Sequence, residues 1–67
     1  MNGRYFDYLL STKGLKRADV AKELEIHVAT LNKKIKGEIR ISVEEAIKIM
    51  DLLQMEFNDI FIDAKKV

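Results

Sequence analysis

The stretch that decides the fold is residues 17–37, RADVAKELEIHVATLNKKIKG. It predicts two short amphipathic helices, 17–24 and 28–36, joined by a turn that is too tight to be a general linker. Ala21 is small enough to let the two helices cross closely, as in a helix-turn-helix motif. Apolar residues recur at helical spacing and predict one shared core, with Ile26 alone in the turn. The core positions of the two helices are Val20, Ala21, Leu24, Leu31 and Ile35.

The other face of the 28–36 helix has no large apolar side chain. On a helical wheel it carries small, amide and cationic groups, at Ala29, Asn32, Lys33 and Lys36. Groups of these kinds read the edges of DNA bases and bind phosphates. An ordinary solvated surface is the alternative for this face.

The composition excludes several classes of protein. Sixty-seven residues make one domain with a small core, so nearly every large apolar residue is needed inside. With no cysteine and a single histidine, we expect no disulfide, no metal site and no cofactor. The opening residues do not resemble a secretion signal, and there is no run of 18 apolar residues. We therefore expect a cytoplasmic protein that does not enter the membrane.

Charge is divided unevenly along the chain. The net charge of +1 is weak support for a nucleic-acid partner. Residues 1–41, however, contain nine Lys or Arg against five Asp or Glu, whereas residues 42–67 contain three against six. The basic charge lies with the helix-turn-helix, and such polarity can orient a small protein toward a phosphate backbone.

The other segments predict three further helices, and hence a compact all-α fold of five helices in one domain. These helices are expected at 3–13, 43–53 and 58–61. Gly14 and Gly37 can each end the preceding helix in the left-handed conformation.

The 43–53 helix has the clearest start, because Ser42 and Glu45 form a capping box. Six of its apolar residues are expected to face the core: Val43, Ala46, Ile47, Ile49, Met50 and Leu53. Three more apolar residues follow that could close the bottom of the core, at Phe57, Ile60 and Phe61. A strand over residues 60–62 is the alternative for this last segment.

Nearly the whole chain resembles the Cro/phage-repressor family of DNA-binding proteins (XRE-type, lambda-repressor-like). The family pattern is a helix ending in K-G-L, a helix with L-A, a turn G-I-S, a helix with T-I or T-L, and a glycine. The counterparts here are Lys13-Gly14-Leu15, Val20-Ala21, Glu25-Ile26-His27, residues 30–35 and Gly37. The segments TLNKKIKG and ISVEEAIKIMDLL are especially similar to the small phage-repressor-like branch. This resemblance implies a regulatory protein of a phage or prophage, acting in a bacterial cell.

Three positions depart from the family pattern. Glu25 stands where the turn usually has glycine, which costs about 1 kcal/mol if its φ is positive. His27 replaces the usual serine or threonine and caps the next helix less well, a loss of about 1 kcal/mol. Arg17 replaces the glutamine that often opens its helix. Because two of these changes lie beside the reading face, they indicate an altered DNA target or a partner that is not DNA.

The resemblance implies that the opening of the 28–36 helix enters the major groove of DNA. The expected base contacts are His27, Val28, Ala29, Asn32 and Lys33. Lys33 can donate to guanine O6 and N7, and Asn32 can pair with adenine N6 and N7. Val28 and Ala29 can touch a thymine methyl group. A solvated surface is the alternative for most of these residues, and burial in the core is the alternative for Val28.

Four cations flank the reading helix where the family holds the DNA backbone, and each could neutralise a phosphate: Lys16, Arg17, Lys36 and Arg40. A charged surface is the alternative for them. Lys34 is expected on the inner side of its helix, running along the first helix. Tyr5 and Tyr8 are expected to pack at an edge or to form part of an interface.

A homodimer is expected, because one recognition helix covers only a few base pairs and two half-sites give more discrimination. The subunit contacts are expected either in the 37–42 loop or in the C-terminal segment, at Phe57, Ile60, Phe61 and Ile62. The alternative is that Phe57 and Phe61 belong to the core.

A protein-interaction module is the competing function. The same fold would then bind a phage repressor or a host protein and act as an anti-repressor or modulator, which the modest net charge and the altered turn favour. An enzyme is not expected, because Ser11, Ser42 and His27 lie on different elements and the three glycines form no phosphate loop.

Overall fold

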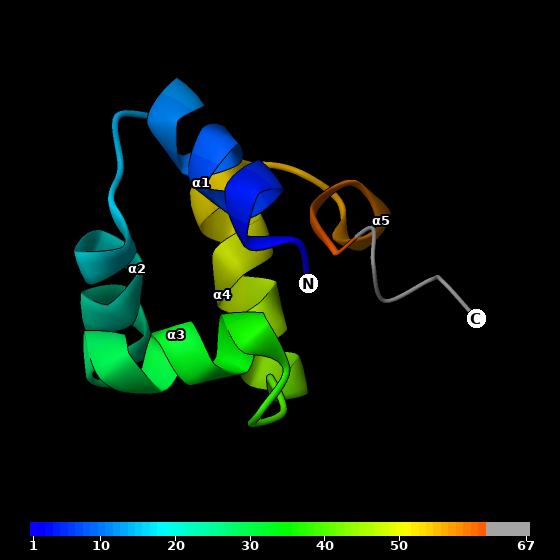
Figure 1. The fold of residues 1–67 in the computed structure, drawn as a ribbon. Helices are drawn as coiled ribbons and strands as arrows, with labels where there is room; N and C mark the ends of the chain where they lie inside the picture. Colours follow the sequence, from blue (N-terminus) through cyan, green and yellow to red (C-terminus); the bar gives the residue numbers. More distant parts are fainter. Residues whose placement is uncertain (62–67) are drawn as a thin grey trace.

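The computed structural model describes residues 1–61, which contain five helices (Figure 1). They are α1 (Gly3–Thr12), α2 (Arg17–Leu24), α3 (Val28–Lys36), α4 (Val43–Leu53) and α5 (Phe57–Ile60). The all-α prediction is confirmed, and no strand occurs in residues 1–61. The predicted bounds hold for α2, α3 and α4, while α1 ends one residue early and α5 lies one residue earlier in the chain. Ile62, named in the strand alternative, lies outside the described residues.

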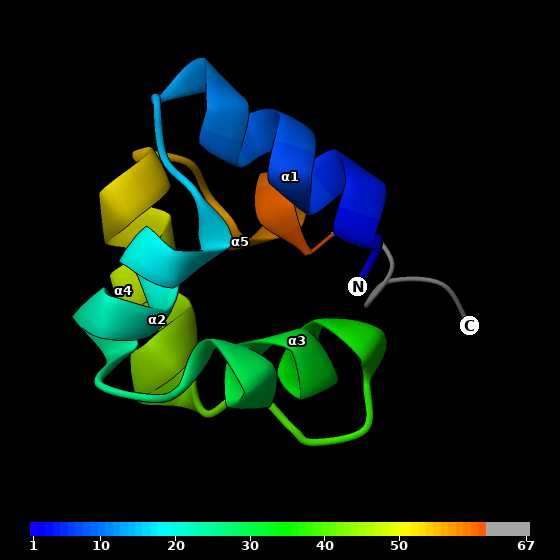
Figure 2. The same ribbon diagram turned by 60° about the vertical axis from the view of Figure 1, so that its left-hand side comes forward.

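The helices enclose the core from different sides. In both ribbon views α1 lies on one side of the molecule and α3 on the opposite side (Figures 1 and 2). The helix α2 contacts both α3 and α4, and α4 in turn contacts α5. This arrangement clamps the inner side of α3 against the body and leaves its outer side at the surface.

Local hydrogen bonds fix where the helices begin. The predicted capping box is confirmed: Ser42 Oγ accepts from the Glu45 N–H at 3.1 Å, and the Ser42 N–H donates to Glu45 Oε1 at 3.0 Å. At the start of α1, Asn2 Oδ1 accepts from the Tyr5 N–H at 3.1 Å. His27 occupies the N-cap of α3 but makes no side-chain capping hydrogen bond, as expected for a weaker cap.

Four helices end in the same left-handed turn. Among residues 1–61, those with positive φ are Gly14 after α1 (68°), Glu25 after α2 (59°), Gly37 after α3 (89°) and Gln54 after α4 (54°). In each turn the N–H of the next residue donates to a carbonyl five residues earlier; the Ile26 N–H, for example, reaches the Ala21 oxygen at 3.0 Å. These bonds satisfy carbonyls that the helix end leaves unpaired. The two glycines adopt this conformation freely, whereas Glu25 and Gln54 hold it at a cost.

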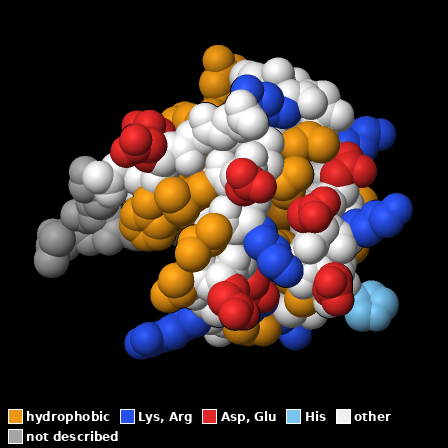
Figure 3. Space-filling model, turned by 180° about the vertical axis from the view of Figure 1, so that it is seen from behind, with side chains coloured by type: hydrophobic (Ala, Val, Ile, Leu, Met, Phe, Trp, Pro, Cys, Tyr) orange, Lys and Arg blue, Asp and Glu red, His pale blue; other side chains and the backbone are white. Residues whose placement is uncertain are grey.

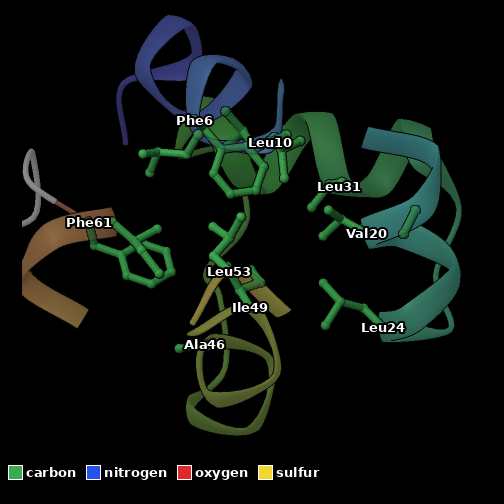
Figure 4. Packing of buried hydrophobic residues seen from close by; sticks show 13 residues of the cluster. Phe6, Leu10, Val20, Leu24, Leu31, Ala46, Ile49, Leu53 and Phe61 are labelled. Carbon is green, nitrogen blue, oxygen red and sulfur yellow. The ribbon is translucent and has the colours of Figure 1, made fainter. Parts of the chain in front are cut away.

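A single cluster of buried hydrophobic side chains joins the five helices (Figure 4). Its members are Phe6, Leu9, Leu10, Val20, Ala21, Leu24, Leu31, Ile35, Ala46, Ile49, Leu53, Ile60 and Phe61. All five apolar positions predicted for the helix-turn-helix are therefore buried, including the small Ala21. A chain of this length depends on such a shared core, because no one of its helices can bury an apolar stripe alone.

The predicted inner face of α4 is wrong at two positions. Ala46, Ile49 and Leu53 are buried, but Val43 is 76% exposed and Ile47 is 57% exposed. The helix carries apolar residues on more than one side, and only the side that meets its neighbouring helices is covered. Periodicity alone does not say which of two apolar stripes finds a partner.

The two tyrosines of α1 have different surroundings. Tyr5 is half-buried, and its hydroxyl donates to the Asp59 carbonyl at 2.7 Å, which ties α1 to α5. Tyr8 is 62% exposed. The expected packing at an edge therefore describes Tyr5.

Candidate nucleic-acid interface

The outer side of α3 presents the residues predicted to read DNA. His27, Ala29 and Lys33 are exposed, and Val28 is 43% exposed. The alternative that Val28 belongs to the core is thereby removed. On the opposite side of the same helix, Leu31 and Ile35 are buried in the core.

Asn32 lies at the edge of this face and is half-buried. Its Oδ1 accepts a hydrogen bond of 2.9 Å from Arg17 Nη1 at the start of α2. Arg17 in turn donates two hydrogen bonds to Asp7 of α1, from Nε to Oδ1 at 2.7 Å and from Nη2 to Oδ2 at 3.0 Å. Three helices thus meet in one polar chain.

The four predicted phosphate contacts are not equivalent. Lys16, Lys36 and Arg40 are exposed, and none forms an ion pair among residues 1–61. Arg17 is instead paired with Asp7, so its charge is already balanced. Of these four cations, three are therefore free to meet an anion beside α3 and one is engaged.

Lys34 points inward, as predicted, but not along the first helix. Its Nζ lies 3.0 Å from Glu45 Oε1 on α4 and donates to the Arg40 carbonyl at 3.0 Å. The hydrogen bond from the Ser42 backbone N–H lowers the pKa of Glu45; partial burial opposes the shift, and Lys34 adds to it. The expected contact with α1 is wrong because the ammonium finds a carboxylate and a carbonyl at the start of α4 instead.

Comparison with protein-family models decides what this arrangement is. Residues 6–66 match the model of the Cro/C1-type HTH DNA-binding domain. The chain belongs to the Cro/C1-type family. No curated protein and no solved structure matches the chain. The family prediction is confirmed, and the match takes in the whole helix-turn-helix together with α4 and α5.

The residues of this Cro/C1-type domain that were expected at a dimer contact fall into two groups. Ile60 and Phe61 are buried, so their side chains are not available to a second subunit; the core alternative, which named Phe57 and Phe61, describes Phe61. Phe57 is 42% exposed and stacks on Phe61 with ring centroids 4.7 Å apart. Ile62 lies outside the described residues.

An apolar groove beside α4 was not anticipated. It runs between the 37–42 loop, α4 and α5, and its exposed walls are Ile39, Val43, Ile47 and Phe57. The space-filling view shows a band of hydrophobic side chains on this side of the molecule (Figure 3). The sequence contained a usable sign of it, because residues 43 and 47 of the expected 43–53 helix are four positions apart and form a second apolar stripe.

Asp7 is the other feature that sequence reasoning missed. Nothing local marks it, because its partner Arg17 lies ten residues further on, beyond the α1–α2 turn.

Among the helices that the structure describes, none has the length and apolar character to cross a membrane.

Proposed function

We propose that this Cro/C1-type domain is a sequence-specific, double-stranded DNA-binding transcriptional regulator of the phage or prophage Cro or repressor type, acting in the bacterial cytoplasm. The observation that carries the proposal is the two-sided character of α3. Leu31 and Ile35 fix the helix to the core, while its outer side presents small, amide and cationic groups to solvent. A helix held in this way can enter the major groove as a rigid unit.

The chemistry of the outer side suits base recognition. The ammonium of Lys33 can donate to guanine O6 and N7, while Val28 and Ala29 offer apolar contact to a thymine methyl group. His27 at the N-cap and Asn32 at the edge complete the proposed base contacts.

Backbone phosphates would be held by the cations on either side of α3. Lys16 precedes α2, Lys36 ends α3 and Arg40 follows in the loop, and all three are exposed. Such contacts set register and affinity without reading sequence. Arg17 is predicted to act in the same way, and its guanidinium also binds Asp7 and Asn32.

A second copy of the chain is the partner we propose for the apolar groove. Recognition through one α3 covers only a few base pairs, so two copies on two half-sites are needed for useful discrimination. The groove includes residues of the 37–42 loop, and it continues along α4 into a hollow bordered by Asp51 and Glu56. Arg40 lies at the other end of this face. In a twofold dimer with antiparallel α4 helices, Arg40 of one copy would therefore lie near Asp51 and Glu56 of the other.

Selection of bound sequences from a random duplex pool tests the DNA proposal directly. The wild-type protein should enrich a palindromic site, and the Lys33→Ala variant should enrich sites with changed base preference. The affinity for the selected site should fall steeply with salt, by about 0.9 in log K for each phosphate contacted. Lys36→Ala should lower that slope by about one unit.

Lys48→Ala is the matched control, because it removes the same charge from an exposed position on α4 away from α3. It should leave both the slope and the selected sequence unchanged. The proposal fails if no duplex in the pool competes better than random DNA.

The exposed groove also favours a second function, that of an anti-repressor or modulator whose main partner is a phage repressor or a host protein. In that case DNA selection would give no enrichment. Substitutions in the groove, and not on α3, would abolish the regulatory effect.

A further inference from the structure

We propose that Asp7, acting through Arg17, is a specificity-determining positioning residue that fixes the side-chain amide of Asn32 in one orientation and so sets the base that Asn32 prefers. The proposal rests on the proposed function. Asp7 itself lies on α1, outside the helix-turn-helix, and reaches the reading helix only through the guanidinium.

The orientation of the amide follows from the chemistry of its partner. A guanidinium has five N–H donors and no acceptor, so only the oxygen of the Asn32 amide can face Arg17. The 2.9 Å bond from Arg17 Nη1 to Asn32 Oδ1 agrees with this. The Asn32 amino group, with its two N–H donors, is then the end left for a base.

An amide presented by its amino group distinguishes between the two purines. Guanine offers two acceptors in the major groove, N7 and O6, which match a pair of donors. Adenine offers one acceptor and one donor, so the usual asparagine–adenine pair also needs Oδ1. Because Oδ1 is turned toward Arg17, the amino group is the end presented to the base, and guanine is favoured over adenine at the position that Asn32 reads.

Asp7 is needed because a single bond does not hold a long side chain still. The carboxylate binds the guanidinium through two parallel bonds, which fixes its plane. Gly3 leaves the room for this, since a Cβ there would lie 3.1 Å from Arg17 Nη2. Without Asp7, Arg17 can turn toward solvent or toward a phosphate, and the amide of Asn32 is free to rotate.

The same geometry predicts that losing Asp7 changes the base preference of the protein without changing its stability. The side chains of Arg17 and Asp7 are 28% and 52% exposed, and ion pairs at such sites contribute little to stability. The Asp7→Asn variant should therefore fold and melt like the wild-type protein while reading DNA differently.

Duplex selection with four proteins tests the proposal. Asn32→Ala identifies the position that Asn32 reads, as the position whose preference disappears. At that position the wild-type protein should prefer guanine to adenine by about tenfold, and Asp7→Asn should reduce the ratio to about twofold or less. Arg17→Lys keeps the positive charge but loses the planar guanidinium that donates two parallel hydrogen bonds, and it should give the same relaxed base preference. Asp7→Asn should also steepen the salt slope, because the released Arg17 becomes able to meet a phosphate.

Glu23→Gln is the control for charge, since it removes the same negative charge from an exposed position on α2. It should leave the guanine-to-adenine ratio unchanged. Equal ratios in the wild-type protein and Asp7→Asn would overturn the proposal, as would a loss of affinity that is the same for every sequence. If the wild-type protein enriches no duplex at all, the proposed function fails instead.

A measurement without DNA distinguishes failure of the Asp7 proposal from failure of the proposed DNA-binding function. In the free protein, the Arg17 Nε–H should exchange with solvent more slowly than those of the exposed Arg4 and Arg40, as seen by NMR. Asp7→Asn should abolish the difference. Rapid exchange at Arg17 in the wild-type protein would refute the proposed positioning whether or not DNA is bound.

Discussion

At the scale of single residues, Glu25 shows how a local departure from pattern is absorbed. The resembling family usually has glycine at this turn position, and the structure gives Glu25 a left-handed backbone with a φ of 59°. The turn keeps its hydrogen bond from Ile26 to Ala21, so the geometry of the motif is preserved. The fold is less stable as a result, because a residue with a side chain is strained in this region of φ and glycine is not.

Glu25→Gly should therefore stabilise the protein by about 1 kcal/mol, the strain relieved being larger than the extra chain entropy that glycine brings to the unfolded state. Urea unfolding followed by circular dichroism gives the free energy of unfolding of both proteins. Lys22→Gly, at an exposed site inside α2, is the comparison and should destabilise by about 1 kcal/mol. A loss of stability in Glu25→Gly would mean that the Glu25 side chain makes a compensating contact.

At the scale of elements, the Glu45 carboxylate takes part both in the cap that begins α4 and in an ion pair with α3. Glu45 accepts from the Ser42 N–H and also pairs with Lys34, and its pKa is lowered in the folded protein. A carboxyl with a lowered pKa stabilises the fold above its unfolded pKa and loses that contribution as the pH falls through the folded value. The junction should thus weaken in acid.

Glu45→Gln should be less stable than the wild-type protein at pH 7, and the difference should shrink as the pH falls below about 4.3, the ordinary pKa of glutamate. Chemical unfolding at a series of pH values measures this. Glu44→Gln changes the neighbouring exposed carboxylate and should show no such convergence. A stability gap for Glu45→Gln that stays constant from pH 7 to pH 3 would exclude the linkage.

Elements also mark the limit of what the sequence could predict. The bounds of α2, α3 and α4 and the capping box at Ser42 followed from local patterns, because caps and periodicity act within a few residues. The inner face of α4 did not, since Val43 and Ile47 belong to an apolar stripe that no other helix covers. The partners of Lys34 and Asn32 likewise depend on residues brought together only by folding.

At the scale of the whole molecule, the outer side of α3 and the groove beside α4 are separate surfaces. The first is polar and cationic, and the second is apolar with charges at its ends. A protein with only the first surface would bind one half-site. Under the proposed function, the second surface would hold a second copy of the chain, so that each α3 would read its own half-site.

Ile47→Glu tests this division, because Ile47 borders both the groove and the adjoining hollow and is exposed enough to change without disturbing the core. A charge buried at the contact should make the variant sediment as a monomer at concentrations where the wild-type protein is a dimer. Its affinity for the full palindrome should fall about 100-fold, because each half-site must then be filled independently. The affinity for a single half-site should stay the same, since α3 is untouched.

Tyr8→Glu makes the same change of charge at an exposed apolar side chain on α1, and should leave the dimer intact. A wild-type protein that remains monomeric both free and on the palindrome would show that the groove serves some other partner.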